Sequence, residues 1–91
     1  MNIMEFEWDE QKREETLRER GLDFASVAEA HWDVAVTDED DRADYGETRF
    51  ASLVPIHDRL CVVAWCMRGD RLRVISLRKA NDRERKRYDE A

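Results

Sequence analysis

Basic side chains gather near the end of the chain. Residues 71–90, RLRVISLRKANDRERKRYDE, hold eight of the sixteen Lys and Arg residues in this 91-residue protein. A guanidinium group binds phosphate through a bidentate fork and stays charged at any physiological pH. Together with Arg68, which lies just before this segment, several of them flank a turn, end the strand that follows and continue into a helix. This cluster consists of Arg68, Arg71, Arg73, Arg78, Lys79, Arg83 and Arg87. The spacing predicts a site for phosphate groups of RNA or DNA.

Such a cluster also has catalytic potential. RNA can be cut without a metal when its own 2′-OH attacks the neighbouring phosphorus, and cations lower the barrier by stabilising the charge that builds on the phosphate. The alternative is that the arginines pair with acidic residues elsewhere. Residues 1–50 carry 6 basic and 16 acidic side chains, whereas residues 51–91 carry 10 basic and 6 acidic ones. This asymmetry indicates either two differently charged faces or an ordinary solvated surface.

The sequence gives little support for a disulfide, a metal site, a catalytic triad or a phosphate-binding glycine loop. Cys61 and Cys66 are five residues apart in an apparent strand, so they point to opposite faces and fit free thiols in a reducing cytosol. His31 and His57 form neither a zinc pattern nor a catalytic triad. The acidic segment 37–47 lacks the order of an EF-hand, and no phosphate-binding glycine loop occurs. We expect no metal, no cofactor, no signal peptide and no membrane span.

The first half of the chain predicts one strand and two helices. Residues 3–8 alternate as a half-buried strand does. Asp9 can cap a highly charged helix over 10–20, which Gly21 can end, and Leu17 is the only large apolar residue of that helix. Asp23 can cap a second helix over 24–32. Its predicted core-facing stripe consists of Phe24, Val27, Ala28, His31 and Trp32.

The second half predicts three antiparallel strands and a final helix. After an acidic loop over 37–47, the strands span 48–56, 60–67 and 71–77, and the middle one is apolar on both faces. Alternation in the third strand places Arg71, Arg73, Ile75 and Leu77 on one face and its remaining residues on the other. An Asn–Glu capping box at 81 and 84 begins the helix. The order β-α-α-β-β-β-α indicates a single α+β domain over 1–91, with helices on a small, mostly antiparallel sheet.

Three sequence blocks resemble the BrnT family of toxins. The segment FEWDEQKREETLRERGLDFASVAE is similar to the family's opening, through Trp8, Asp9, Lys12, Gly21, Phe24 and Ala28. DYGETR resembles Y-G-E-x-R, through Tyr45, Gly46, Glu47 and Arg49. RVISLRKANDRERKRY resembles R-[IV]-I-S-A-R-K-A followed by E-R and a Tyr, through Arg73, Ser76, Arg78, Lys79, Ala80, Glu84, Arg85 and Tyr88. The three blocks occur in order and together span residues 4–90.

The resemblance implies a RelE-like ribonuclease fold and the toxin half of a type II toxin–antitoxin pair. It implies a cytoplasmic endoribonuclease that cleaves RNA and inhibits translation. Its partner would be a BrnA-like antitoxin with a ribbon-helix-helix region. The complex would bind operator DNA only through the antitoxin. Two toxins and two dimerised antitoxins would form a heterotetramer.

The motif matches and the basic cluster give two sets of candidate residues. The catalytic set is Lys12, Arg20, Glu47, Arg49, Arg73 and Arg78, and the RNA-binding set is Arg68, Lys79, Arg83 and Arg87. Several have a structural alternative. Lys12 can pair along its helix with Asp9 or Glu15. Glu47 is an acid–base candidate if burial raises its pKa, and otherwise it orients an arginine such as Arg49.

The chain departs from the family pattern in the first helix. Thr16 replaces the usual Asn, and Glu19-Arg20 replaces Lys-His. The missing His is the natural candidate for proton transfer, because only His titrates near neutral pH. Arg20 can hold a phosphate but cannot act as a base. Two alternatives to a ribonuclease therefore remain: a catalytically weak toxin-fold protein that acts as an antitoxin-binding co-repressor, or an interaction protein with no nucleic-acid role.

Overall fold

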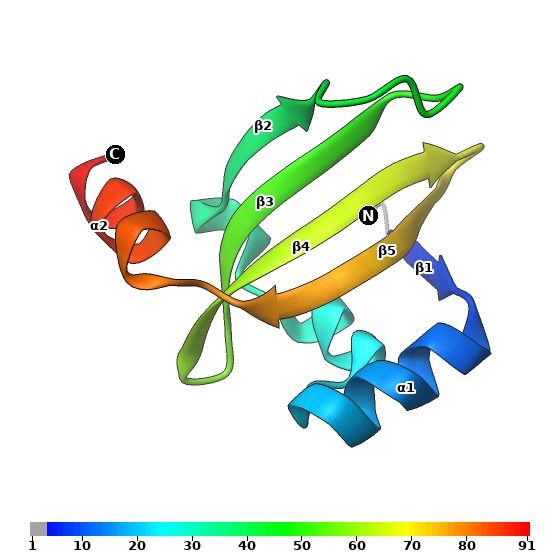
Figure 1. Ribbon diagram of the computed structural model, residues 1–91, viewed down its shortest axis with the longest axis horizontal. Coiled ribbons are helices and arrows are strands. Elements are labelled where there is room, and N and C mark those ends of the chain that lie inside the picture. The colour runs from blue at the N-terminus through cyan, green and yellow to red at the C-terminus, as the bar shows by residue number, and fades with distance from the viewer. Residues whose placement is uncertain (1–3) are drawn as a thin grey trace.

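The computed structural model describes residues 4–91 and contains one five-stranded sheet (Figure 1). Two α-helices and two short 3-10 helices accompany the sheet. In chain order the elements are β1 (Glu5–Trp8), α1 (Glu10–Arg20), η1 (Phe24–Glu29), η2 (Trp32–Val34), β2 (Val36–Asp40), β3 (Arg49–Ile56), β4 (Arg59–Arg68), β5 (Arg71–Lys79) and α2 (Asp82–Glu90). No helix in this described part of the chain is long and apolar enough to cross a membrane.

The strands lie in the order β1-β5-β4-β3-β2. Strands β2 to β5 pair antiparallel, and β1 pairs parallel with β5. Two tight turns join β3 to β4 and β4 to β5, and each contains a residue in the left-handed region: His57 with φ 53° and Gly69 with φ 62°. Such turns match the twist of the strands they connect. The α+β class and the mostly antiparallel sheet are confirmed.

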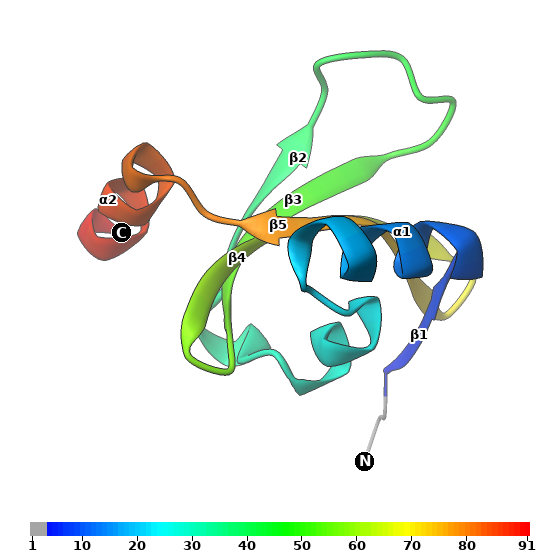
Figure 2. The same cartoon turned by 60° about the horizontal axis from the view of Figure 1, so that its bottom comes forward.

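One face of the sheet forms the main core. Phe24 and Val27 of η1 are fully buried and pack against inward-facing residues such as Val54, Val63 and Leu77. The 3-10 helices and α1 lie on this side in the view of Figure 2. The opposite face is covered by α2 at one end and is open to solvent elsewhere.

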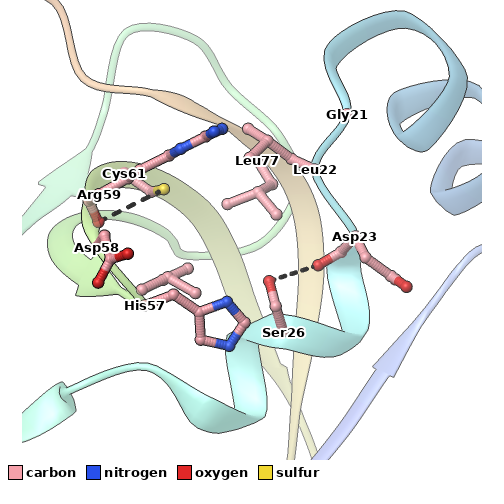
Figure 3. A pocket seen from close by; sticks show the side chains of 10 residues that line it. Gly21, Leu22, Asp23, Ser26, His57, Asp58, Arg59, Cys61 and Leu77 are labelled. Atoms are coloured by element: carbon pink, nitrogen blue, oxygen red, sulfur yellow. Dashed lines mark hydrogen bonds between the residues drawn. The ribbon is translucent and has the colours of Figure 1, made fainter.

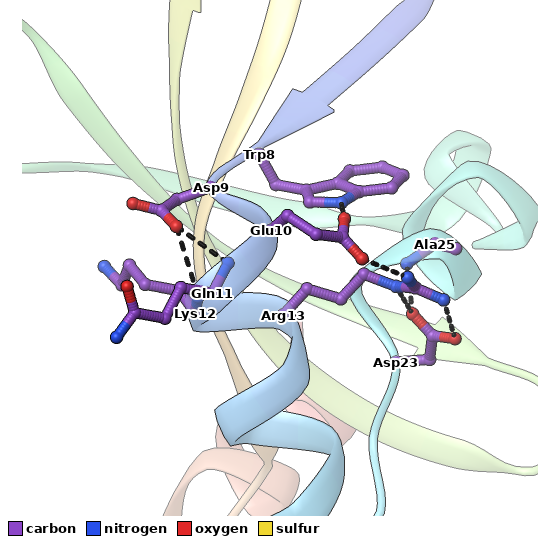
Figure 4. A network of polar contacts seen from close by, with 8 residues as sticks. All are labelled: Trp8, Asp9, Glu10, Gln11, Lys12, Arg13, Asp23 and Ala25. Carbon is purple, nitrogen blue, oxygen red and sulfur yellow. Dashed lines mark hydrogen bonds and ion pairs between the residues drawn. The ribbon is translucent and has the colours of Figure 1, made fainter.

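Helix α1 is held by polar contacts, because none of its side chains is buried. Asp9 caps its first turn, and Gly21 ends it in the left-handed conformation with φ 69°. Arg13 donates to Asp23 at 2.7 Å and to Glu10 at 2.5 Å, as Figure 4 shows. The caps and the light packing of this helix are as the sequence predicts.

The second predicted α-helix is wrong. Residues 24–34 form two 3-10 helices, which have three residues per turn. The backbone turns extended at Ala30, with ψ 152°, and His31 N–H donates to the Pro55 carbonyl at 2.9 Å. This bond to β3 replaces an intrahelical one. The predicted stripe therefore breaks: Ala28 and His31 are exposed, whereas the residues at 24 and 27 are buried.

The predicted acidic loop contains a strand that the sequence reading missed. Strand β2 pairs with β3 in full register, from Val36 opposite Leu53 to Asp40 opposite Arg49. Asp38 and Glu39 are exposed at the edge of the sheet, where charge protects against pairing with other chains, whereas the Asp40 side chain is largely covered. The order is therefore β-α-β-β-β-β-α, with 3-10 helices in place of the second α-helix.

A β-bulge in β5 corrects the predicted faces of that strand. Val74 lies opposite Trp65 and Ser76 lies opposite Ala64, so Ile75 has no partner of its own on β4. Before Ile75 the even-numbered residues of β5 face the core, and after it the odd-numbered residue Leu77 does. Leu77 therefore points into the core, with no exposed surface, and not to the face of Arg73 as simple alternation predicts.

The remaining predictions agree with the structure to within a few residues. The predicted first strand starts two residues before Glu5, and its residue 3 lies outside the described residues. The last helix has the predicted capping box: Asn81 accepts from the Glu84 backbone at 2.8 Å, and Glu84 accepts from the Asn81 backbone at 2.9 Å. Tyr88 packs with Leu53, Val62 and the chain beside them, so α2 closes one end of the outer sheet face.

Candidate nucleic-acid interface

A trough crosses the outer face of the sheet. Its floor is a cross-strand row of small residues, in which Ala64 of β4 lies between Ala51 of β3 and Ser76 of β5. The trough has a volume of about 330 Å³. One wall is the segment from Glu39 to Arg42 and the other includes Arg78 and Glu84, with Val62 in the floor.

Further arginines and carboxylates lie on the same face of the sheet, beyond one end of the trough. Cys66 lies opposite Arg73 in the β4–β5 ladder, and Arg49 immediately precedes the Phe50–Trp65 pair of the β3–β4 ladder. Arg73 donates to Glu7 of β1 at 2.7 Å. The parallel pairing of β1 with β5 brings these two residues together although 66 positions separate them.

Glu47 joins two arginines in this region. One of its oxygens accepts from Arg49 Nε at 3.2 Å, and the other lies 3.2 Å from Arg68 Nη2. The Arg49 guanidinium, and more weakly that of Arg68, holds the pKa of Glu47 below its ordinary value. Acid–base catalysis by Glu47 would require a raised pKa, which this carboxyl does not have. In the free protein its carboxylate instead contacts Arg49 and Arg68. Arg49 also stacks over the Tyr45 ring, 4.1 Å from its centroid.

Arg78 lines the trough itself, four positions of β4 away from the level of Arg73. It lies opposite Val62, whereas Arg73 lies opposite Cys66, which corresponds to a separation of about 13 Å along the strands. Both Nη atoms of Arg78 donate to Glu84, each at 2.8 Å. Without the bulge, Arg73 and Arg78 would face opposite sides of the sheet. The bulge therefore assembles the site.

The wall formed by the β2–β3 connection adds an ion pair that the sequence reading did not single out. Arg42 donates to both oxygens of Asp40, at 2.8 and 2.9 Å. This contact lowers the pKa of Asp40 to about 2. Arg42 and Arg78 line the trough, and Arg49 and Arg73 lie further along the same face of the sheet. Each of the four already has a carboxylate partner.

The other predicted residues lie around this site but not in it. Lys12 and Arg20 are exposed on α1, eight residues apart and so about 12 Å along the helix. Arg20 donates to the Leu77 carbonyl of β5 at 2.8 Å, at a point that β1 no longer covers. Lys79 ends β5, and Arg83 is exposed on α2. Arg87 of α2 forms an ion pair with Asp38 of β2.

Sequence reasoning missed the acidic partners Glu7, Asp40 and Glu84 and the wall residue Arg42. Glu84 was recognised as a helix cap and as part of the third family block, but not as the partner of Arg78. For Asp40 and Arg42 the spacing of two residues was a local signal. For Glu7 no local signal exists, because its pairing with Arg73 depends on the placement of β1 beside β5.

A second cavity, of about 350 Å³, lies on the helix-covered side of the sheet (Figure 3). Several of its polar residues make structural bonds. The Ser26 hydroxyl donates to the Asp23 carbonyl at 2.6 Å, and the Cys61 thiol contacts the Arg59 carbonyl at 3.9 Å. Burial raises the pKa of Cys61, which keeps its thiol protonated and unreactive. The trough is therefore the stronger candidate site.

The fold and the trough define a small α+β protein with an arginine-rich face on a five-stranded sheet. Residues 8–84 match the family described as the ribonuclease toxin, BrnT, of type II toxin–antitoxin systems, so the chain belongs to that family. The fold also matches the crystal structure of the Brucella abortus ribonuclease toxin BrnT. The TM-score is 0.67 at 28% identity, over 87% of this chain and 99% of that one. No curated protein in the comparison matches the chain.

Family membership confirms the resemblance seen in the sequence. It identifies the chain as the toxin of a type II toxin–antitoxin system, in a family of ribonuclease toxins, and implies an antitoxin as partner. The family match does not rest on the first helix alone, because the matched range also includes β2 to β5 and the start of α2.

Proposed function

We propose that this chain is a metal-independent endoribonuclease toxin that binds and cleaves RNA in the trough and thereby inhibits translation. The observation that carries the proposal is the trough itself. Its floor of small side chains lets a nucleic-acid strand approach the sheet closely, and arginines stand on both sides to receive phosphates. In this proposal residues 1–91 form a single domain with a RelE-like fold.

The proposed chemistry uses the RNA's own nucleophile. The 2′-oxygen attacks the adjacent phosphorus and loses its proton, while the bond from phosphorus to the 5′-oxygen breaks and that oxygen gains a proton. Arg73 and Arg78 lie about 13 Å apart along the strands, so each would hold the non-bridging oxygens of a different phosphate, and Arg49 would add charge stabilisation near Glu47. Removing one preorganised donor of this kind typically costs on the order of a hundredfold in rate.

Proton transfer is where this chain would differ from its family pattern. Arg20 stands where the motif has His, and its guanidinium is engaged by the Leu77 carbonyl. A guanidinium cannot take up a proton, so water would exchange the protons in this chain. General acid–base catalysis is typically worth about 10²- to 10⁴-fold, and we expect a rate below that of a His-containing toxin by a factor in this range.

Flanking cations would extend the RNA path. Lys79 and Arg83 make no ion pair among the described residues and lie beside the Arg78 end of the trough, Arg68 lies at the other end, and Lys12 is likewise unpaired on α1. Arg87 pairs with Asp38 and would have to exchange that partner.

The proposed partner is a BrnA-like ribbon-helix-helix antitoxin that covers the basic face. Two toxins and dimerised antitoxins would form a heterotetramer in the cytoplasm, and only the antitoxin would bind operator DNA. Family membership supports the existence of an antitoxin, and the arginine-rich face supports an acidic antitoxin segment as the covering element.

A catalytically weak protein is the second candidate function. The specific observation that favours it is that every arginine around the trough already pairs with a carboxylate, and neither His57 nor His31 lies in the trough. Such a protein would still bind its antitoxin and act as a co-repressor. Growth arrest on expression, rescued by the antitoxin, would distinguish the ribonuclease from this alternative.

The decisive experiment compares two double variants in cleavage of purified RNA and in cell-free translation. The test variant carries Arg73→Ala and Arg78→Ala. The control carries Arg18→Ala and Arg59→Ala, which remove two exposed cations that border neither side of the trough. We expect the wild type and the control to cleave alike and the test variant to lose activity by more than about a hundredfold.

The other outcomes are equally informative. If the wild type leaves RNA intact, the enzyme proposal fails and the co-repressor function replaces it. If both double variants lose activity to the same extent, net charge rather than the trough explains cleavage. Circular dichroism of each variant shows whether the fold is retained.

A further inference from the structure

Glu84 takes part in two structures at once. Its carboxylate accepts both Nη groups of Arg78, each at 2.8 Å, and one of its oxygens also accepts the backbone N–H of Asn81 at 2.9 Å. The second contact belongs to the capping box that begins α2. A single carboxylate therefore connects the arginine at the trough with the first turn of the last helix.

Arg78 cannot bind a phosphate through its Nη fork while this contact persists. Carboxylate and phosphate oxygens occupy the same positions on a guanidinium fork. Nη1 of Arg78 also donates to the Lys79 carbonyl at 3.3 Å, so only Nε–H and one N–H of Nη2 are not bonded within the described chain. Arg73 and Arg49 differ, because each donates to its carboxylate through one nitrogen only.

We propose that Glu84 is a built-in competitor for phosphate at Arg78, and that an oxyanion which displaces it also releases the cap of α2. The inference rests on the proposed function, because it assumes that RNA phosphates reach the trough. In the free protein the Glu84 carboxylate occupies the phosphate position. Bound RNA takes that position, and the first turn of α2 loses one of its two capping bonds.

The geometry provides a substitution that separates the two roles. A Gln at the third position of a capping box accepts the same backbone N–H as Glu does. Glu84→Gln therefore keeps the contact with Asn81 but gives Arg78 a neutral partner with one acceptor atom instead of two. Glu90→Gln is the matched control, because it removes the same charge from the exposed end of the same helix.

The first measurement is binding of a fluorescent 2′-deoxy oligonucleotide, which cannot be cleaved by its own 2′-OH. We expect Glu84→Gln to bind about three- to fivefold more tightly than the wild type, which is the effect of removing a partly exposed ion pair. Glu90→Gln should leave affinity nearly unchanged. The gain should vanish in the Arg78→Ala background, where Glu84→Gln has no arginine to release.

The second measurement uses inorganic pyrophosphate and the backbone amide signals of α2 in NMR spectra. Pyrophosphate should shift the amide signals of residues 81–84 in the wild type, and should do so at lower concentration in Glu84→Gln. This readout does not require RNA binding. If pyrophosphate exchanges with Glu84 but the oligonucleotide does not bind, the competitor role stands and the proposed function fails.

Two results would overturn the inference. One is equal tightening by Glu84→Gln and Glu90→Gln, or tightening that survives in the Arg78→Ala background, which would show an effect of net charge alone. The other is weaker oligonucleotide binding by Glu84→Gln, which would make Glu84 a residue that positions Arg78 for phosphate rather than one that competes with it.

Discussion

At the scale of single residues, position 20 combines a structural bond with a departure from the family motif. Arg20 donates to the Leu77 carbonyl where β5 has no neighbouring strand. An imidazole at this position would be too short to keep that bond in the same form, but it would titrate near pH 6.5. The substitution therefore exchanges a contact at the sheet edge for a group that can transfer protons.

We expect Arg20→His to cleave RNA faster than the wild type and to acquire a pH dependence centred near 6.5. Arg20→Gln is the control, since it also removes the guanidinium but cannot titrate. The measurement is the cleavage rate of one purified RNA between about pH 5 and 8. A flat profile for the His variant would place residue 20 outside the reaction.

The residue scale also shows where sequence reasoning stops. The spacing of Tyr45, Glu47 and Arg49 was a reliable pointer to the arginines and carboxylates beyond one end of the trough, because these residues are close in the chain. The sequence analysis placed Arg73 and Arg78 in one catalytic set, although strict alternation would put their side chains on opposite faces of the sheet. Only the unpaired Ile75 brings the two to one face, and a bulge depends on how two strands match in space.

At the scale of elements, a buried serine joins three strands. Ser52 of β3 has no exposed surface. Its hydroxyl bonds to Thr37 of β2 at 2.7 Å and accepts from Trp65 Nε1 of β4 at 2.8 Å. These two hydrogen bonds help to explain how the acidic edge strand β2 stays attached to the sheet although most of its residues are exposed.

We expect Ser52→Ala to lower the free energy of unfolding by about 2 kcal/mol, because it leaves two polar partners without their bond in a buried site. For a chain of this size the melting temperature should fall by roughly 10 °C. Ser76→Ala is the control, because Ser76 lies on the trough floor and makes no side-chain hydrogen bond among the described residues. Thermal unfolding followed by Trp fluorescence tests both. A loss of less than about 0.5 kcal/mol for Ser52→Ala would contradict this role of the two hydrogen bonds.

Helix α2 should respond to acid through Glu84. The Arg78 guanidinium lowers the pKa of this carboxyl from 4.5 to about 2. A folded-state pKa below the unfolded value contributes stability above pH 4.5, and this stability is lost as the pH falls toward 2. We expect the difference in melting temperature between the wild type and Glu84→Gln to be constant near neutral pH and to shrink across that window. A difference that does not change with pH would show that the ion pair adds no stability.

The elements themselves were predictable to different degrees. Caps such as Asp9, Gly21 and Asn81 are local signals, and the helices they delimit were found. The 3-10 helices were read as one α-helix because Phe24 and Val27 fit either period, and the bond from His31 to Pro55 that ends the first of them is tertiary. Strand β2 was hidden by its charge, since an edge strand needs little apolar content.

At the scale of the whole molecule, the opposite charges of the two halves meet on one face. Basic residues of β4, β5 and α2 pair with acidic residues from β1, β2 and the β2–β3 connection, and further pairs form within each half. The outer face is therefore nearly balanced in charge, and RNA would gain affinity only where it replaces a carboxylate. The net charge of −6 would disfavour long-range attraction of RNA, so in the proposed function affinity would come from local exchange at the trough.

Salt should reveal how many arginines exchange. If Arg49, Arg73 and Arg78 each contact one phosphate, the logarithm of the binding constant for a single-stranded oligonucleotide should fall with the logarithm of salt concentration at a slope of about −2. Arg73→Ala should reduce the slope to about −1.4. Fluorescence anisotropy over a range of salt concentrations measures both. A slope near zero would favour an interaction protein with no nucleic-acid role.

Helix α1 has no buried side chain and is anchored by its caps, by Arg13 and by one bond from Arg20. Most of its positions can therefore change without creating a cavity, so mutations there cost little folding energy. The departures from the family motif, Thr16 and Glu19-Arg20, fall in this helix. Under the proposed function, substitutions in this one surface helix could change the rate of RNA cleavage while the sheet, and any surface that an antitoxin covers on it, keeps the same shape.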